Sequence, residues 1–255
     1  MNHLAHALLA GDDEDRVLGG LLGDFLRGAV PTTLRPGVQD GLRLHRAIDA
    51  YTDRHPVLAA LRPRFQAPWR RYAGIILDVW FDHLLARDFT RWSAQPLPAY
   101  GAALQALLQR RAAELPPALQ RFAAYMRRHD LPAAYADRDV LARVFAGLST
   151  RLSRTNPLAD ALHETARLEP ELGAAFAEFF PQLLQFAAAW RAATTPGTRR
   201  GTAAPWPWSR PRAHTGRRCP RPLRSRHGRS PCAASLPLPL STSSPSPPGY
   251  RPSLA

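Results

Sequence analysis

Helical periodicity runs along this chain from residue 2 to residue 192 and constrains its fold more than any other feature. Apolar residues recur every three or four positions, and the alternation typical of strands is nowhere sustained. The sequence therefore predicts an all-α protein built as a multi-helix bundle. Prolines fall at or near the expected helix starts, where a missing amide hydrogen costs little. They are Pro36, Pro56, Pro98, Pro117, Pro157 and Pro170. We expect helices over roughly 2–10, 13–28, 37–54, 56–65, 69–89, 98–113, 117–129, 138–153, 157–167 and 171–192.

The composition changes abruptly after residue 195. Residues 196–255 hold 11 of the 34 basic residues, 13 of the 26 prolines and no acid. Such a segment cannot bury enough apolar surface to offset the entropy of ordering it. We therefore expect a helical domain over 1–195 and a disordered Arg/Pro/Ser-rich extension over 196–255. Charge alone would let such a basic segment bind nucleic acid or an anionic membrane. Apart from Pro205-Trp-Pro-Trp208 it lacks the interleaved aromatic residues of a single-strand binder, so no specific nucleic-acid partner is expected.

Cysteine usage and the N-terminal segment indicate a cytoplasmic protein. Cys219 and Cys232 both lie in the extension, so the helical domain has no disulfide and no thiol chemistry. The first ten residues lack a basic segment and are followed at once by acids, unlike a signal peptide. No apolar run reaches the roughly 18 residues that span a bilayer, so no membrane partner is expected.

Acids and histidines interrupt three of the apolar helical patterns. His45 and Asp49 are four residues apart and so share a helix face, as do Asp78 and Asp82. Side chains from several helices can in this way converge on one point of the interior. The three interruptions occupy residues 22–27, 44–49 and 77–83.

The helix expected at residues 69–89 is apolar nearly all round, which predicts a central, buried helix. Its acids Asp78 and Asp82 must therefore lie in the core or line a cavity. Burying an unpaired charge costs several kcal/mol, so these acids need either a bound cation or basic partners. From the residues alone a divalent metal and a structural network with Arg43, Arg46, Arg70 or Arg71 are equally open.

Six short motifs, read in order, resemble one known family. They are Met1-Asn-His-Leu-Ala-His6, Gly23-Asp-Phe-Leu-Arg-Gly28, Gly41-Leu-Arg-Leu-His-Arg-Ala-Ile-Asp49, Thr52-Asp53, the stretch from Arg70 to His83, and Phe179-Phe-Pro181. Their order and spacing are similar to those of the bacterial acyl carrier protein phosphodiesterases, from residue 1 to about residue 192.

This resemblance implies a fold distantly similar to the HD-domain metal phosphohydrolases. It also implies hydrolysis of the phosphodiester that joins 4′-phosphopantetheine to a serine of acyl carrier protein, with Mn²⁺ as the preferred ion. The extension has no counterpart in the family and inherits nothing from it.

The chemistry of the bond explains why histidines, acids and arginines are needed. A phosphodiester anion repels hydroxide, so a hydrolase needs cations on the non-bridging oxygens and a metal that generates a nucleophile near neutral pH. Mn²⁺ accepts imidazole and carboxylate together, and surplus candidates would orient ligands or move protons. We expect metal ligands among His6, Asp24, His45, Asp82 and His83, catalytic roles for Asp24, His45, Arg46, Asp49 and Asp78, and phosphate or partner contacts by Arg27, Arg46, Arg70 and Arg71.

Two of these assignments have structural alternatives. Asp24 interrupts an apolar stripe and could instead pair with Arg27 one turn further on. Asp82 and His83 look like the doublet of HD hydrolases, yet adjacent helical residues point about 100° apart, so both bind one ion only in a tight geometry.

The remaining histidines are assigned structural or surface roles. His3 lies one turn from His6 but is expected to be solvated or in the core. His55 precedes Pro56 at a helix junction, and His129 and His163 lack acid-rich apolar surroundings. Three glycines in a helical pattern are expected to permit close helix packing: Gly19, Gly20 and Gly23.

Three functions remain in competition. The first is a metal-dependent hydrolase of holo-acyl carrier protein, a small acidic partner that a basic rim including Arg127, Arg128, Arg151 and Arg154 would steer. The second is an HD-type phosphohydrolase with a nucleotide or another small phosphoester as substrate. The third is a non-catalytic helical protein that binds acyl carrier protein or nucleic acid, with the acids and histidines as a structural network.

Overall fold

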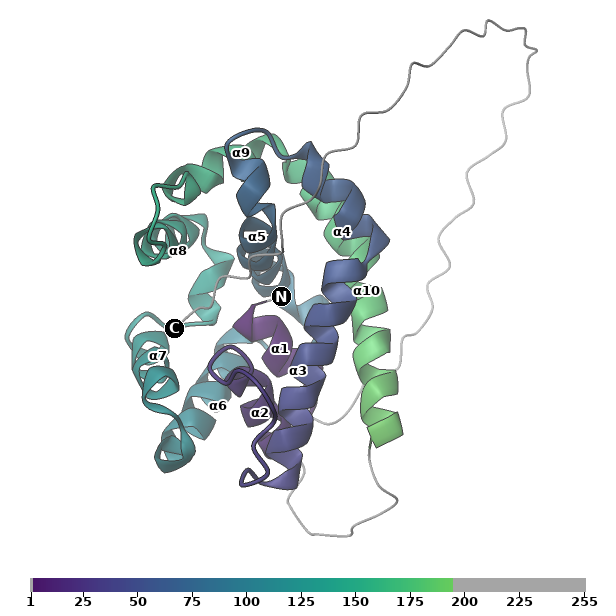
Figure 1. Ribbon diagram of the computed structural model, residues 1–255, viewed down its shortest axis with the longest axis vertical. Coiled ribbons are helices and arrows are strands. Elements are labelled where there is room, and N and C mark those ends of the chain that lie inside the picture. The colour runs from purple at the N-terminus through teal and green to yellow at the C-terminus, as the bar shows by residue number, and fades with distance from the viewer. Residues whose placement is uncertain (1, 195–255) are drawn as a thin grey trace, which may run out of the picture. The chain divides into compact units, whose positions relative to one another are not determined.

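The computed structural model describes residues 2–194, and regular structure in this range is entirely helical. This confirms the predicted all-α class (Figure 1). The predicted extension, with both cysteines, lies outside the described residues. The α-helices are α1 (His3–Leu9), α2 (Glu14–Leu22), α3 (Pro36–Arg54), α4 (Pro56–Leu61), α5 (Ala73–Arg87), α6 (Leu97–Arg110), α7 (Pro117–Arg128), α8 (Arg138–Arg151), α9 (Ala161–Arg167) and α10 (Glu169–Thr194). Short 3-10 turns are η1 (Arg62–Arg64), η2 (Trp69–Tyr72), η3 (Phe89–Arg91), η4 (Ala112–Glu114), η5 (Ala133–Ala136) and η6 (Leu158–Asp160).

Proline sets several helix starts as predicted. Pro36, Pro56 and Pro117 are the first residues of α3, α4 and α7. The clearest departure is α2, which was expected to continue to residue 28 and instead ends at Leu22. The chain then forms a turn, in which the Leu22 carbonyl accepts hydrogen bonds from the next residues, before it leaves the helix axis.

Helices α2 and α3 pack with their backbones in close contact because glycines face each other. A Cβ atom added to Gly19 would lie 2.1 Å from the carbonyl oxygen of Val38, and one added to Gly41 would lie 2.1 Å from that of Arg16. No side chain fits in either gap. This confirms the packing role predicted for Gly19 and fixes α2, which leads into the turn of Asp24, against α3, which carries His45 and Asp49.

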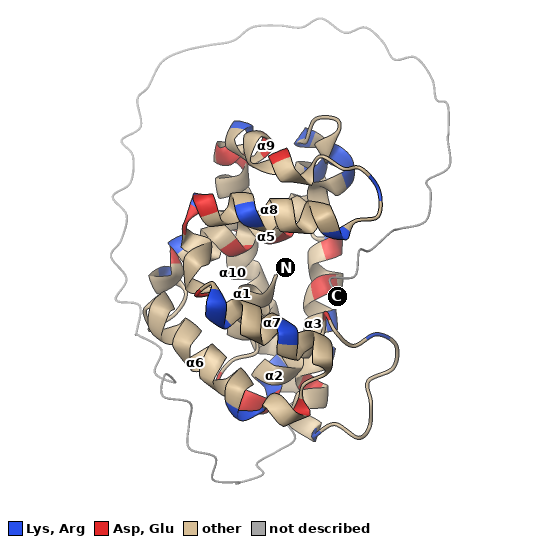
Figure 2. Cartoon of the chain, turned by 90° about the vertical axis from the view of Figure 1, so that its left-hand side faces the viewer, with Lys and Arg blue, Asp and Glu red and all other residues tan. Residues whose placement is uncertain are grey.

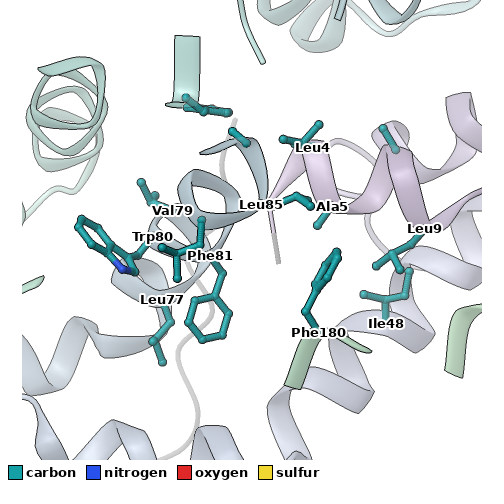
Figure 3. Packing of buried hydrophobic residues seen from close by; sticks show 14 of the residues in the cluster. Leu4, Ala5, Leu9, Ile48, Leu77, Val79, Trp80, Phe81, Leu85 and Phe180 are labelled. Atoms are coloured by element: carbon teal, nitrogen blue, oxygen red, sulfur yellow. The ribbon is translucent and has the colours of Figure 1, made fainter. Parts of the chain in front are cut away.

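Helix α5 is the central buried helix, as predicted. Eleven of its fifteen residues are buried, and it contacts α1, α8, α9 and α10. Figure 3 shows Leu4 and Ala5 of α1 packed near Leu85 of α5, with Phe180 of α10 beside them. The core therefore holds α1 between α5 and α10.

In the part of the chain that the structure describes, no helix combines the length and the apolar character that crossing a bilayer requires.

Candidate metal centre

Two histidines come from α1, whose first turn is fixed by a carboxylate from α5. The spacing of three residues puts His3 and His6 on one side of α1, and both are buried. Asp82 accepts hydrogen bonds from the backbone N–H groups of Leu4, at 2.9 Å, and Ala5, at 3.3 Å. A buried acid far along the chain thus satisfies amides that a helix start leaves without partners.

The other three residues come from α3 and from the turn that follows α2. Asp24 lies in the turn that follows α2, and His45 and Asp49 lie one turn apart on α3. Gly23 allows this arrangement, because a Cβ atom there would lie 2.1 Å from Cγ of His45. The imidazole of His45 therefore packs directly on the backbone of the turn that presents Asp24.

These five side chains form one group, which we call the His/Asp cluster: His3, His6, Asp24, His45 and Asp49. Asp49 bridges two imidazoles, with Oδ1 3.3 Å from Nε2 of His6 and Oδ2 3.3 Å from Nε2 of His45. Asp24 faces two as well, with Oδ2 3.3 Å from Nε2 of His3 and Oδ1 3.7 Å from Nε2 of His45. The rings of His6 and His45 stack with their centroids 3.8 Å apart.

Hydrogen bonds on the far side of two rings determine which nitrogen faces the acids. Nδ1 of His45 lies 2.8 Å from the carbonyl oxygen of Gly20, which can only accept, so Nδ1 donates. Nδ1 of His3 donates in the same way to Oδ1 of Asn2. Each ring therefore turns Nε2 toward the carboxylates, and Nε2 of His3 is buried opposite Asp24 without a hydrogen bond.

Burial and the neighbouring carboxylates shift the pKa values of the histidines in opposite directions. Burial lowers the pKa of His3, and it lowers the pKa of His6 to about 4, so both are neutral at pH 7. Burial also opposes the charged form of His45, but Asp49 and Asp24 outweigh it and raise the pKa of His45 above its usual value. Burial acts to raise the pKa of Asp49, but the imidazoles of His45 and His6 hold it far below its usual range.

This donor set fits a divalent cation. A neutral Nε2 and a carboxylate oxygen both present lone pairs, so their approach to 3.3 Å, as at His3 and Asp24, is favourable only with a positive charge between them. Single ligand atoms of His6, His45 and Asp49 all lie within 4.8 Å of one another. Imidazole nitrogen and carboxylate oxygen suit first-row divalent metals, and His45 and His3 carry the outer hydrogen bonds that orient metal-binding imidazoles.

The cluster has a buried side and an accessible side. The side chains of its three histidines are 1 to 7% exposed, whereas those of Asp24 and Asp49 are 25% and 21% exposed. A substrate could therefore approach from the side of the carboxylates, while the imidazoles anchor the site in the core.

Three candidates on α5 occupy different places. Burial raises the pKa of Asp78, and the negative charge of Asp49 raises it further, which places Asp78 near the cluster. The structure does not bring Asp82 or His83 into the cluster, and the two side chains point to different neighbours. Asp82 binds the start of α1, and Nδ1 of His83 donates to the carbonyl of Tyr135 at 2.8 Å.

The arginines expected to bind phosphate lie in two regions. Arg46 donates from Nη2 to the carbonyl of Leu26 at 3.2 Å, beside the turn that carries Asp24, and Arg27 is exposed on the same loop. The other two, Arg70 and Arg71, are exposed on η2 ahead of α5.

The alternative of an arginine network is not what surrounds these acids. Arg43 pairs with Asp40 at 2.8 Å, and Arg70 donates to the carbonyl of Phe65. Within residues 2–194 neither Asp24 nor Asp82 forms an ion pair with an arginine, and Arg27 does not pair with Asp24. Histidines take that place at Asp24, and the backbone amides of Leu4 and Ala5 take it at Asp82.

Sequence reasoning missed His3 as a member of the cluster. The three-residue spacing to His6 was the available signal, because it puts both rings on one face of a helix. The other histidines lie as expected: His55 is buried against Phe179, and His129 and His163 are exposed.

Comparison with known proteins yields one family. Its sequence model, described as acyl carrier protein phosphodiesterase, matches residues 1–183. A curated acyl carrier protein phosphodiesterase of Serratia proteamaculans (strain 568) is 34% identical over 186 residues, which cover 72% of this chain and 96% of that protein. Proteins of the same name from Salmonella dublin and Salmonella agona are each 33% identical over 189 residues, covering 74% of this chain and 98% of each relative. No solved structure matches the chain, and the expected likeness to HD-domain hydrolases stays a prediction.

Proposed function

The chain belongs to the acyl carrier protein phosphodiesterase family, and we propose that it hydrolyses the phosphodiester between 4′-phosphopantetheine and serine in holo-acyl carrier protein. The products are apo-acyl carrier protein and 4′-phosphopantetheine. We further propose that the reaction needs a divalent metal, Mn²⁺, held by the His/Asp cluster.

The observation that carries this proposal is the convergence of three imidazoles and two carboxylates from three elements on one partly accessible point. Metal-binding side chains are His6, His45 and Asp49, with Asp24 and His3 completing the shell. A bound divalent cation would neutralise the non-bridging phosphate oxygens and lower the pKa of a coordinated water.

Residues beside the cluster supply the remaining chemistry. Burial raises the pKa of Asp78, so this carboxyl keeps a proton at higher pH than an exposed aspartate and can pass it to the serine oxygen as that oxygen leaves. Arg46 and Arg27, next to the turn of Asp24, can bind the phosphate oxygens through their guanidinium groups.

Mass spectrometry of the carrier protein tests the proposal. The full chain is incubated with holo-acyl carrier protein, with Mn²⁺ or with EDTA. We expect loss of the phosphopantetheine mass with Mn²⁺ only, and almost complete loss of this activity in Asp49→Asn. An unchanged carrier mass under every divalent metal, or cleavage of nucleotides in preference to the carrier protein, would refute the proposed substrate.

A further inference from the structure

Many exposed arginines of the described domain have an acidic partner. Each such pair is a local arrangement in which the positive charge is already balanced at the surface. Pairs with N···O distances up to 3.6 Å are Arg35 with Glu114, Arg43 with Asp40, Arg62 with Asp53, Arg64 with Glu171, Arg87 with Asp88, Arg110 with Glu14 and Arg138 with Glu169.

Helix α7 and the end of α8 differ, because their arginines are exposed and form no ion pair with any other residue between 2 and 194. The sequence explains the difference: neither residues 115–129 nor residues 140–159 contain an Asp or a Glu. Four of these exposed arginines, on α7 and from the last residue of α8 onward, are Arg121, Arg128, Arg151 and Arg154.

One exposed aromatic residue lies among these charges. Arg121, Tyr125 and Arg128 follow one another at spacings of four and three and so form a stripe along α7. Tyr125 is 39% exposed and is the one large apolar side chain exposed in the described part of the chain. Tyrosine and arginine are enriched where protein interfaces carry most of their binding energy.

This stripe adjoins the His/Asp cluster. Phe122, on the inner side of α7, has its ring centroid 4.2 Å from that of His3. Arg151 is close enough to His3 to add to the effect of burial in lowering its pKa, and both Tyr125 and Arg151 act electrostatically on Tyr135. In Figure 2, α7 and α8 run across the face toward the viewer on either side of the start of α1, and both carry basic residues.

We propose that Arg121, Tyr125, Arg128, Arg151 and Arg154, together called the arginine face, dock an acidic protein surface and thereby bring its phosphodiester to the His/Asp cluster. This inference rests on the proposed function, in which that protein is acyl carrier protein. The charge is complementary: four unbalanced positive groups meet an acidic partner beside the reacting group. A single-stranded nucleic acid would need several aromatic residues on which successive bases stack, and the arginine face exposes one.

The test compares two full-length variants with the wild type. The triple variant Arg121→Glu/Arg128→Glu/Arg151→Glu reverses the arginine face. The control is Arg91→Glu on η3, an arginine that is also exposed and forms no ion pair with residues 2–194, but lies over the ring of Trp92 instead. KM and kcat are measured with holo-acyl carrier protein and Mn²⁺ at several salt concentrations, together with the rise in melting temperature caused by Mn²⁺.

We expect the triple variant to raise KM at least tenfold at low salt with kcat changed less than threefold, and to keep the stabilisation by Mn²⁺. The difference in KM between the wild type and the triple variant should shrink at high salt, because screening weakens long-range attraction. The control should resemble the wild type.

An unchanged KM in the triple variant, or an equal rise in the control, would overturn the docking surface. So would a variant that loses binding of a DNA fragment while its KM for the carrier protein stays the same. Failure of the proposed function gives a different result, because the wild type itself would then release no phosphopantetheine.

Discussion

At the scale of single residues, the cluster depends on the absence of a side chain at Gly23. The backbone of Gly23 has φ −55° and ψ −39°, a conformation that any residue adopts. Its conformational freedom is therefore not what the position needs. The need is for space, because a Cβ atom would lie 2.1 to 2.3 Å from three ring atoms of His45.

Gly23→Ala tests this steric requirement. We expect the alanine to displace the imidazole of His45 from Asp49 and to weaken Mn²⁺ binding at least tenfold, while overpacking costs roughly 1–3 kcal/mol of stability. Isothermal titration calorimetry measures the affinity. The matched control is Gly74→Ala on α5, where a Cβ atom meets nothing within 4 Å. Equal affinities in the two variants would show that the ring of His45 has no part in binding.

The charge of His45 predicts how Mn²⁺ affinity depends on pH. Burial acts to lower the pKa of His45, but Asp49 and Asp24 raise it above its usual value, so metal binding must displace a proton. His6, with a pKa of about 4, is already neutral above pH 5. Affinity should therefore rise about tenfold per pH unit below the pKa of His45 and level off above it. Calorimetry from pH 6 to 8.5 in two buffers of different ionisation enthalpy counts the released proton; a pH-independent affinity contradicts this assignment.

At the scale of elements, α1 brings two imidazoles to the cluster, and the carboxylate of Asp82 holds its first turn. The sequence predicted α1 and the buried position of Asp82 on α5. It could not predict that the amides of Leu4 and Ala5 lie opposite that carboxylate, because helical spacing tells which residues share a face and not which neighbouring helix that face meets. Asp82 was therefore taken for a metal ligand.

Asp82→Asn tests whether Asp82 caps the start of α1 or binds the metal. Because an amide oxygen still accepts hydrogen bonds, we expect Mn²⁺ affinity within about threefold of the wild type. Asp82→Ala, which leaves buried amides without an acceptor, should lose roughly 1–3 kcal/mol of stability. Urea unfolding and calorimetry measure both effects. If Asp82→Asn weakened binding as much as Asp49→Asn does, Asp82 would be a ligand after all.

The carboxyl of Asp82 also predicts a trend of stability with pH. Burial raises its pKa from 3.8 to about 7, although the Leu4 amide opposes this. Between pH 4 and 7 the folded protein holds a proton that the unfolded chain has released, so this contribution to stability is complete at low pH and is lost as the pH rises through 7. In EDTA, the stability of the wild type relative to Asp82→Asn should fall from pH 5 to 8. A rise in this relative stability over the same pH range would contradict the predicted direction.

Helix starts were easier to predict than the end of α2. Pro36, Pro56 and Pro117 mark their starts through local chemistry that needs no knowledge of neighbours. After Leu22 the residues Phe25 and Leu26 continue an apolar helical spacing, so the pattern predicted helix to residue 28. The turn instead brings Asp24 to His3 and His45, which are distant in sequence and so were invisible to the local pattern.

At the scale of the whole molecule, the family was predicted from collinear motifs, and the match over residues 1–183 confirms it. The structure brings together four residues of the predicted site: His6, Asp24, His45 and Asp49. They could be predicted because pairs at helical spacing and interruptions of apolar stripes are visible in the sequence. The contributions of His3 and Gly23 depend on how α1, α2 and α3 meet, which no local pattern encodes.

The proposed domain boundary near residue 195 gives a prediction for the whole chain. The family match ends at residue 183, and α10 ends at Thr194 with Trp190 and Arg191 still in contact with the domain. A chain ending at residue 195 should therefore melt within about 2 °C of the full chain and bind Mn²⁺ with the same affinity. Differential scanning calorimetry compares the two. A fall of 10 °C or more would move the boundary into residues 196–255.

The central claim is that the His/Asp cluster is a divalent metal centre, and anomalous X-ray diffraction from crystals grown with Mn²⁺ tests it most directly. The account predicts a strong anomalous peak within bonding distance of His6, His45 and Asp49, lost in Asp49→Asn crystals. A peak at Asp82 and His83 instead, or no peak in crystals of an enzyme that hydrolyses holo-acyl carrier protein in EDTA, would contradict it.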